Sequence, residues 1–240
     1  KPEDNGGNTA IMRARLEDNN LVDKEQLFKA EPDTRSGVHF GCRMAFDGNG
    51  YLFFSVGERG NPPNAQDLTN HCGKIHRIHD DGRIPDDNPF VDNPDAKHTI
   101  WSYGHRNPQG LAFHPETGVL WSTEHGPKGG DELNIIRKGD NYGWPEITYG
   151  INYDGTIITE DTAKAGMEQP VIHWTPSIAA CGMAFADGDV YPEWANDIFS
   201  GSLSFRYVVR TQLDGESVDK HEILLREAGR VRSIETGPDG

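Results

Sequence analysis

Short apolar runs separated by Asp-Gly or Asn-Gly turns are the most frequent pattern along the chain. In the clearest case, the apolar runs 44–46 and 51–55 flank the turn sequence DGNG at 47–50. Two short apolar runs joined by such a turn are typical of an antiparallel hairpin. Helical periodicity is scarce, so the pattern predicts an all-β fold.

Related hairpin patterns recur, which indicates a repeat architecture. They span residues 111–122 and 183–201, and residues 233–240 resemble the opening half of another copy. The copies are about 70 residues apart, which fits propeller blades that carry long loops. We therefore expect residues 1–240 to form a single β-propeller domain, and because the last copy stops at its turn, we expect a partial ring, incomplete at both ends. An immunoglobulin-like array is the competing all-β fold, but its Cys…Trp…Cys framework is absent.

Composition narrows the function classes. The formal net charge is −15, so the chain lacks the basic surface that a nucleic-acid partner requires. No apolar run is long enough for a membrane span. Cys42, Cys72 and Cys181 show no CxxC spacing, so a zinc site is not expected. The first residues do not form a signal peptide, as is also true of a mature secreted protein.

Polar residues crowd the segment 104–110, immediately before an apolar run. Arg106 offers a permanently charged guanidinium for carboxylates or a carbonyl oxygen, and Asn107 follows it. Loops at strand ends are where propellers build sites. The alternative is a surface arginine followed by an Asn-Pro turn.

The segment 124–134 combines glycines with carboxylates. Its glycines let backbone carbonyls approach a ligand, and Asp131 and Glu132 add anionic oxygens, a mixture that calcium prefers. The EF-hand spacing is absent, and an ordinary acidic loop is the alternative. In the next segment, 139–153, aromatic residues beside glycines are typical of a pocket for a planar ligand. Packing between blades is the alternative for Trp144.

His39 precedes the clearest hairpin, and Glu58 follows its second strand. Imidazole is suited to proton transfer near neutral pH, and a carboxylate can orient the ring. We therefore expect these two side chains to meet, although a histidine before a strand is more often structural.

These segments together resemble the soluble PQQ-dependent glucose/sorbosone dehydrogenase family, and within it the PQQ-dependent aldose sugar dehydrogenases. The matching strings occur in the family's order: HFGCR (39–43), IPDDNPF (84–90), WSYGHRNPQG (101–110), EHGP (124–127) with GGDE (129–132), and NYGWP (141–145). The resemblance implies a six-bladed β-propeller that oxidises aldose sugars at the anomeric carbon and passes electrons to an external acceptor. It also implies a periplasmic or secreted location.

The resemblance further assigns catalytic roles. His39 matches the general base that removes the proton of the anomeric hydroxyl, and Glu58 matches a carboxylate that holds its ring. Arg106 matches the arginine that polarises the quinone oxygen of PQQ. Other matching positions are cofactor contacts, namely Asn107, Tyr153, Trp174, Arg230 and Arg232.

Calcium is implied at two places. The main-chain oxygens of Gly126 and Pro127 match a calcium site against PQQ, and Glu132 with Tyr142 matches a second site. The sequence departs from the family at Ser204, where a cofactor-binding lysine is expected. Losing that ammonium weakens the expected attraction for anionic PQQ. The change to Ser204 leaves a non-catalytic carbohydrate-binding propeller as an alternative, and a calcium-dependent lactonase-like hydrolase, which would use a metal in the acidic loop, is the other.

Overall fold

The structure is a computed structural model that describes residues 6–237. Within this range the chain is built from β-strands and two short 3-10 helices, without an α-helix. The all-β fold predicted from the turn pattern is therefore confirmed. The elements are β1 (Ala10–Glu17), β2 (Asn20–Lys29), β3 (Met44–Phe46), β4 (Tyr51–Val56), η1 (Pro62–Ala65), β5 (Lys74–His79), β6 (Ile100–Tyr103), β7 (Pro108–Phe113), β8 (Leu120–Glu124), β9 (Asp131–Ile136), β10 (Ile172–Trp174), β11 (Ala180–Phe185), η2 (Pro192–Trp194), β12 (Ile198–Ser202), β13 (Val208–Asp214) and β14 (Ser217–Leu224).

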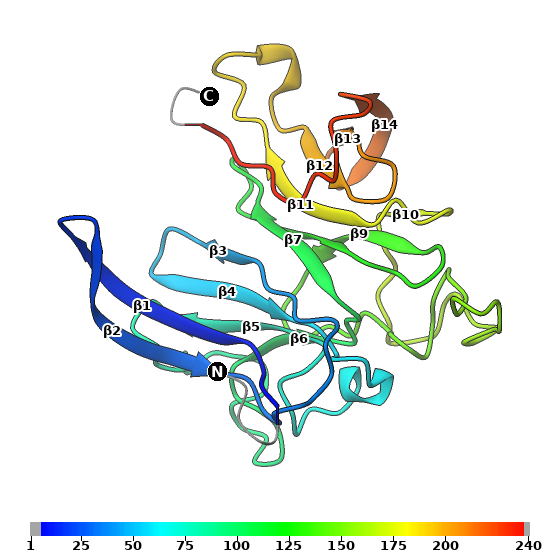
Figure 1. The fold of residues 1–240 in the computed structure, drawn as a ribbon. Helices are drawn as coiled ribbons and strands as arrows, with labels where there is room; N and C mark the ends of the chain where they lie inside the picture. The colour runs from blue at the N-terminus through cyan, green and yellow to red at the C-terminus, as the bar shows by residue number, and fades with distance from the viewer. Residues whose placement is uncertain (1–5, 238–240) are drawn as a thin grey trace.

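The strands form one hairpin and three four-stranded antiparallel sheets (Figure 1). The hairpin pairs β1 with β2, and the sheets contain β3–β6, β7–β10 and β11–β14. In each sheet, neighbours along the chain are neighbours in space, which is the meander of a propeller blade. The described sheets do not close into a ring.

The predicted hairpins are present. The turn at 47–50 joins β3 to β4, with Met44 opposite Phe54 and Phe46 opposite Leu52. The hairpins expected in 111–122 and 183–201 are β7–β8 and β11–β12. Of the last expected copy, residues 233–237 form no strand, and residues 238–240 lie outside the described residues.

The apolar cores lie between successive sheets. Alternate residues of a strand point to opposite faces, so both faces of β4 are covered. Leu52 and Phe54 pack against Phe28 of the β1–β2 hairpin, whereas Phe53 packs towards Leu111 of the second sheet. A further core between the second and third sheets contains Trp121, Leu133, Met183, Phe185 and Ile198.

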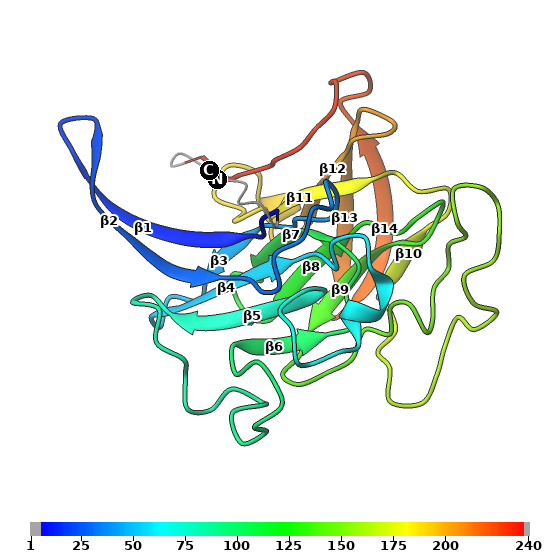
Figure 2. The same cartoon turned by 60° about the horizontal axis from the view of Figure 1, so that its bottom comes forward.

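The first strands of the three sheets lie together, because β7 packs against both β3 and β11 (Figures 1 and 2). Backbone hydrogen bonds then join the chain segments beyond the strand ends. Glu58 N donates to Arg106 O at 2.9 Å, and His125 N donates to Asn107 O at 3.2 Å. The segments after β4, before β7 and after β8 therefore meet at one end of the sheets.

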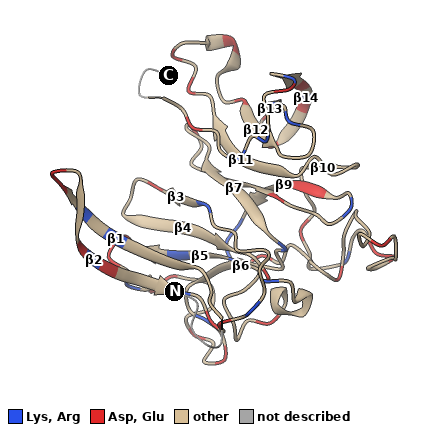
Figure 3. Cartoon of the chain, viewed as in Figure 1, with Lys and Arg blue, Asp and Glu red and all other residues tan. Residues whose placement is uncertain are grey.

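Acidic and basic positions are interspersed along the β1–β2 hairpin and over β13 and β14 (Figure 3). None of the helices in residues 6–237 has the length and hydrophobicity that a membrane crossing requires.

Candidate active site

His39 and Glu58 are in contact. The Glu58 carboxylate is 1% exposed, and its Oε1 meets Nδ1 of the His39 ring, whose side chain is 18% exposed. Glu58 Oε2 is buried without a hydrogen-bond partner in residues 6–237. Because a carboxylate only accepts, Nδ1 carries the proton and Nε2 can receive another. The meeting expected from the hairpin is thus observed.

The loop that carries His39 is held by two neighbouring residues. The buried Arg59 guanidinium donates to Ser36 O at 2.7 Å and Val38 O at 2.5 Å, and lies over the Phe40 ring. A Cβ at Gly57 would lie 2.2 Å from the His39 carbonyl oxygen, so glycine is required there. The position of His39 is therefore fixed by the segment that follows β4.

Arg106 is fixed at its guanidinium. Nη1 donates to His125 O at 3.0 Å and to Gly126 O at 2.9 Å, and the group lies 5.4 Å from the Trp144 ring. Trp144 is buried and contacts this cation. The alternative considered from the sequence, packing between blades, did not include this contact. Asn107 Oδ1 accepts from Gly41 N at 3.2 Å and from Gln109 Nε2 at 3.0 Å.

Two buried carboxylates hold the backbone around this site. Glu124 accepts from the backbone N–H groups of Arg106 and Asn107. Asp131 accepts from Gly126 N at 2.9 Å and Ala180 N at 3.0 Å, besides the Ser177 hydroxyl. Asp131 was expected to supply oxygens for calcium, and in the structure its carboxylate accepts these three hydrogen bonds.

His125 lies beside the Arg106 guanidinium, which donates to its main-chain oxygen. Burial, followed by the charges of Arg106, Arg232 and His39, lowers the pKa of His125 to about 4. Its Nε2 is buried without a partner among the described residues. Arg106 bonds directly to the His125 main-chain oxygen, and both arginines act on the imidazole through their charge, which makes this region electropositive towards an anionic ligand.

A groove of about 590 Å³ lies beside His125. Its volume is in the range of small-molecule sites. Four predicted site residues line it, namely Gly126, Pro127, Tyr153 and Ser204.

The remaining predicted cofactor residues do not line the groove. Arg232 Nη1 donates to Gln109 Oε1 at 3.2 Å, which places it near β7. Arg230 is exposed and donates to Leu203 O at 3.3 Å, next to Ser204. Trp174 is not among the residues lining the groove and packs in the core between the second and third sheets.

Glu132 and Tyr142 line one small space of about 10 Å³. Burial, with a contribution from Glu124, raises the pKa of Glu132 to about 8. The Tyr142 hydroxyl donates to the main-chain oxygen of Ile135 and accepts from the N–H of Arg137. No cluster of three His, Cys, Asp or Glu side chains suited to a metal occurs in residues 6–237. The available donors are hard oxygens, which suits calcium rather than zinc.

The sequence reasoning missed the parts played by Glu124 and His105. Both are buried polar residues, and Glu124 ends a strand that directly faces Pro108 at the start of β7. A carboxylate at the end of an apolar strand was the available signal, but two of its three partners are backbone N–H groups, which no motif specifies.

Comparison with known proteins decides the family. The whole chain, residues 1–240, matches the family described as Glucose / Sorbosone dehydrogenase. The chain belongs to this family. The membership expected from the five strings of the glucose/sorbosone dehydrogenases is thereby confirmed.

Individual glucose/sorbosone dehydrogenase relatives are similar over the whole chain. It is 46% identical to aldose sugar dehydrogenase YliI of Escherichia coli K12, covering 99% of this chain and 66% of the relative. It is 40% identical to the uncharacterized protein slr1608 of Synechocystis, covering 97% of this chain and 59% of that protein. The chain therefore spans about two thirds or less of these curated relatives.

Solved structures agree with this assignment. The apo-form of the soluble aldose sugar dehydrogenase from Escherichia coli matches with a TM-score of 0.96 and 44% identity, over 100% of this chain and 71% of that chain. The PQQ-bound form of an aldose sugar dehydrogenase from Streptomyces coelicolor matches with a TM-score of 0.77 and 30% identity, over 95% of this chain and 62% of that chain.

Proposed function

We propose that the protein is a PQQ- and calcium-dependent dehydrogenase that oxidises aldose sugars at the anomeric carbon to lactones and passes the electrons to an external acceptor. The observation that carries the proposal is a carboxylate-held imidazole, His39, whose partner Glu58 is joined through its backbone N–H to the main-chain oxygen of Arg106. We also propose that residues 1–240 belong to a single six-bladed propeller domain that works in the periplasm or outside the cell.

The fit to PQQ rests on charge and shape. PQQ is planar and tricarboxylic, so it requires cations beside a groove. Arg106 and Arg232 lie near His125, which lines the groove, and Arg230 lies next to Ser204 on its wall. Asn107 and Tyr153 are proposed to complete the binding region, whereas Trp174, which packs in the core, is not. Guanidinium groups suit carboxylates because their donors form a rigid fork.

The residues of this chain would then divide the work of sugar oxidation. Glu58 keeps the His39 ring oriented, and Nε2 of His39 takes the proton of the anomeric hydroxyl. Arg106 stabilises negative charge where the reacting oxygen lies, and needs little reorganisation because its Nη1 is already held by the His125 and Gly126 oxygens. PQQ, when bound, supplies the acceptor for the hydride that leaves the anomeric carbon.

Calcium would be held by main-chain oxygens of Gly126 and Pro127. The Gly126 oxygen already accepts a hydrogen bond from Arg106, and a carbonyl oxygen has a second lone pair for a cation. A Cβ at Gly126 would lie 2.2 Å from Gly130 O, so the glycine keeps the loop closed. A second calcium would lie at Glu132 and the main chain of Tyr142.

Reconstitution tests the proposed function. The purified protein given PQQ and Ca²⁺ is expected to reduce a redox dye in the presence of aldoses. His39→Ala should lower kcat by about 10²–10⁴-fold, the usual contribution of a positioned base. His98→Ala, at a half-buried histidine bonded to Asn93 O, is the matched control and should not change kcat. Unchanged turnover in His39→Ala would remove His39 from this role.

A further inference from the structure

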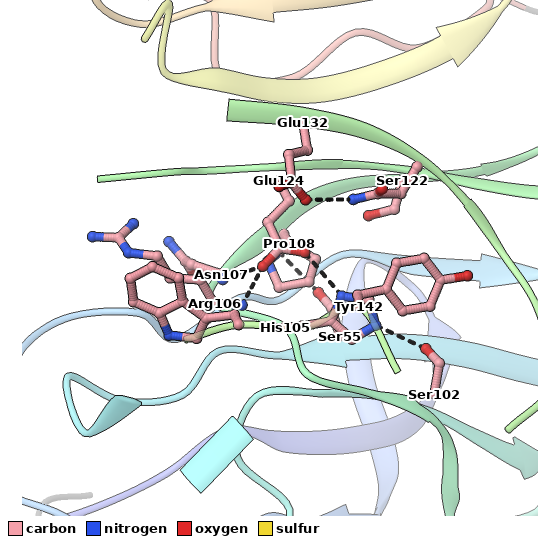
Figure 4. Close-up of polar contacts among 12 residues, drawn as sticks. Ser55, Ser102, His105, Arg106, Asn107, Pro108, Ser122, Glu124, Glu132 and Tyr142 are labelled. Carbon is pink, nitrogen blue, oxygen red and sulfur yellow. Dashed lines mark hydrogen bonds and ion pairs between the residues drawn. The ribbon is translucent and has the colours of Figure 1, made fainter. Parts of the chain in front are cut away.

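Three buried side chains next to the backbone of Arg106 are joined by hydrogen bonds (Figure 4). The Ser102 hydroxyl lies 2.8 Å from His105 Nε2, and His105 Nδ1 lies 2.9 Å from Glu124 Oε2. All three residues are at most 4% exposed. The arrangement has the form of a Ser-His-Glu triad, but its burial prevents any substrate from reaching the serine.

The other Glu124 oxygen faces the backbone. Oε1 accepts from the N–H groups of Arg106 and Asn107, the latter at 3.1 Å. One carboxylate therefore satisfies three donors from consecutive residues, His105, Arg106 and Asn107. Buried N–H groups without a partner are costly, so these bonds hold the segment in one conformation.

The ring of His105 is itself fixed. It stacks on Tyr142 with ring centroids 4.6 Å apart, and its two nitrogens are both bonded. Because a carboxylate only accepts, Nδ1 donates to Glu124. Ser102 and Tyr142 thus hold His105, His105 holds Glu124, and Glu124 holds the backbone of Arg106.

We propose that Glu124, oriented by His105 and Ser102, is a positioning residue that sets where the Arg106 guanidinium lies in the active site. This inference rests on the proposed function, in which Arg106 acts on the quinone oxygen. In this role Glu124 matters because its side chain is long enough to accept from three donors, and its negative charge is not required.

Two variants separate the length of the Glu124 side chain from its charge. Glu124→Asp keeps the charge but is one methylene shorter, so it cannot meet all three donors. Glu124→Gln keeps the length, and its amide oxygen can still accept from both backbone N–H groups. Its amide NH₂ then donates to His105 Nδ1, while His105 Nε2 donates to the Ser102 hydroxyl.

Kinetics give the first readout. Glu124→Asp should lower kcat by about 10- to 100-fold, as loss of an orienting partner usually does, with KM for the aldose little changed. Glu124→Gln should stay at least about tenfold more active than Glu124→Asp. Equal kcat in all three proteins, or a greater loss in Glu124→Gln, would overturn the proposal.

A double variant tests whether Glu124 acts through Arg106. In the Arg106→Ala background, Glu124→Asp should cause no further loss of kcat, because residues acting as one unit are not additive. A full additional loss would show that Glu124 acts elsewhere. Asp197→Asn is the matched control: Asp197 directly precedes β12 and is a buried carboxylate that binds Arg210 of β13 at 2.6 Å, and the loss of its charge should lower stability without lowering kcat.

Apo crystals provide a readout that needs no cofactor. In Glu124→Gln the Arg106 guanidinium should keep its bonds to the His125 and Gly126 oxygens, and in Glu124→Asp it should leave them. An unmoved Arg106 in Glu124→Asp would refute the inference. A wild-type protein that neither binds PQQ in an optical titration nor oxidises aldoses would refute the proposed function instead, and the apo crystals would still decide the positioning of Arg106.

Discussion

Glu58→Gln tests the division of work between the base and the carboxylate that holds it. The substitution keeps the volume of a side chain that is only 1% exposed, so the fold should tolerate it. It removes the charge that faces His39 Nδ1. If the new amide turns its NH₂ towards Nδ1, the ring proton moves to Nε2, and Nε2 can then no longer accept the proton of the sugar.

The size of the effect follows from electrostatics. Two unit charges about 4 Å apart interact by about 4 kcal/mol at an effective dielectric constant near 20. That attraction matters only after His39 has taken the sugar's proton, so its loss raises the barrier rather than KM. At about 1.4 kcal/mol per factor of ten, Glu58→Gln should lower kcat by about 10²–10³-fold.

The assay is dye-linked aldose oxidation by protein saturated with PQQ and Ca²⁺, with sugar deuterated at the anomeric carbon run in parallel. The isotope effect on kcat should persist or increase in Glu58→Gln, because the chemical step is slowed. A kcat within about twofold of wild type would refute the role given to Glu58.

Three further predictions concern other parts of the molecule. Gly57→Ala should lower kcat by about 10²-fold, because its Cβ would lie 2.2 Å from the His39 carbonyl oxygen and displace the base. Ser204→Lys should tighten PQQ binding about fivefold in a titration, because an ammonium on the groove wall contributes about 1 kcal/mol towards an anionic ligand. His71→Gln should make the free energy of unfolding less sensitive to acid, because burial lowers the pKa of His71 to about 4. The neutral ring of His71 accepts at Nδ1 from Glu31 N at 3.0 Å.

The sign of the His71 effect is fixed by its depressed pKa. Unfolded histidine takes up a proton below about pH 6.5, whereas buried His71 stays neutral down to about pH 4. The free energy of unfolding of wild type relative to His71→Gln should therefore fall as the pH decreases from about 6.5 to 4, by at most about 3 kcal/mol. Parallel pH curves for the two proteins in chemical denaturation would contradict this.

For Ser204→Lys the control is Ser204→Gln, which adds length without charge and should not tighten PQQ binding.

The local part of the fold could be predicted from the sequence because it depends on neighbouring residues. The turn at 47–50 and its flanking apolar runs specify the β3–β4 hairpin. The same closeness in sequence made the meeting of His39 and Glu58 predictable. By contrast, the long segments between β5 and β6 and between β9 and β10 carry no periodic pattern, and their course is set by tertiary contacts.

The support behind the site was not predictable in the same way. Asp131 accepts from the backbone N–H groups of Gly126 and Ala180, and these two bonds were not predicted. Such bonds depend on where distant strands bring the backbone, and every residue except proline has the same N–H. The bonds of Glu124 to the backbone at Arg106 escaped prediction for that reason.

A crystal structure of the protein with PQQ and Ca²⁺ tests the central claim most directly. We expect the quinone to lie at the groove beside Gly126 and Pro127, its oxygens within hydrogen-bonding distance of Arg106 and Arg232, with His39 Nε2 facing the ring. PQQ bound elsewhere, or bound here with His39 turned away, would contradict the account.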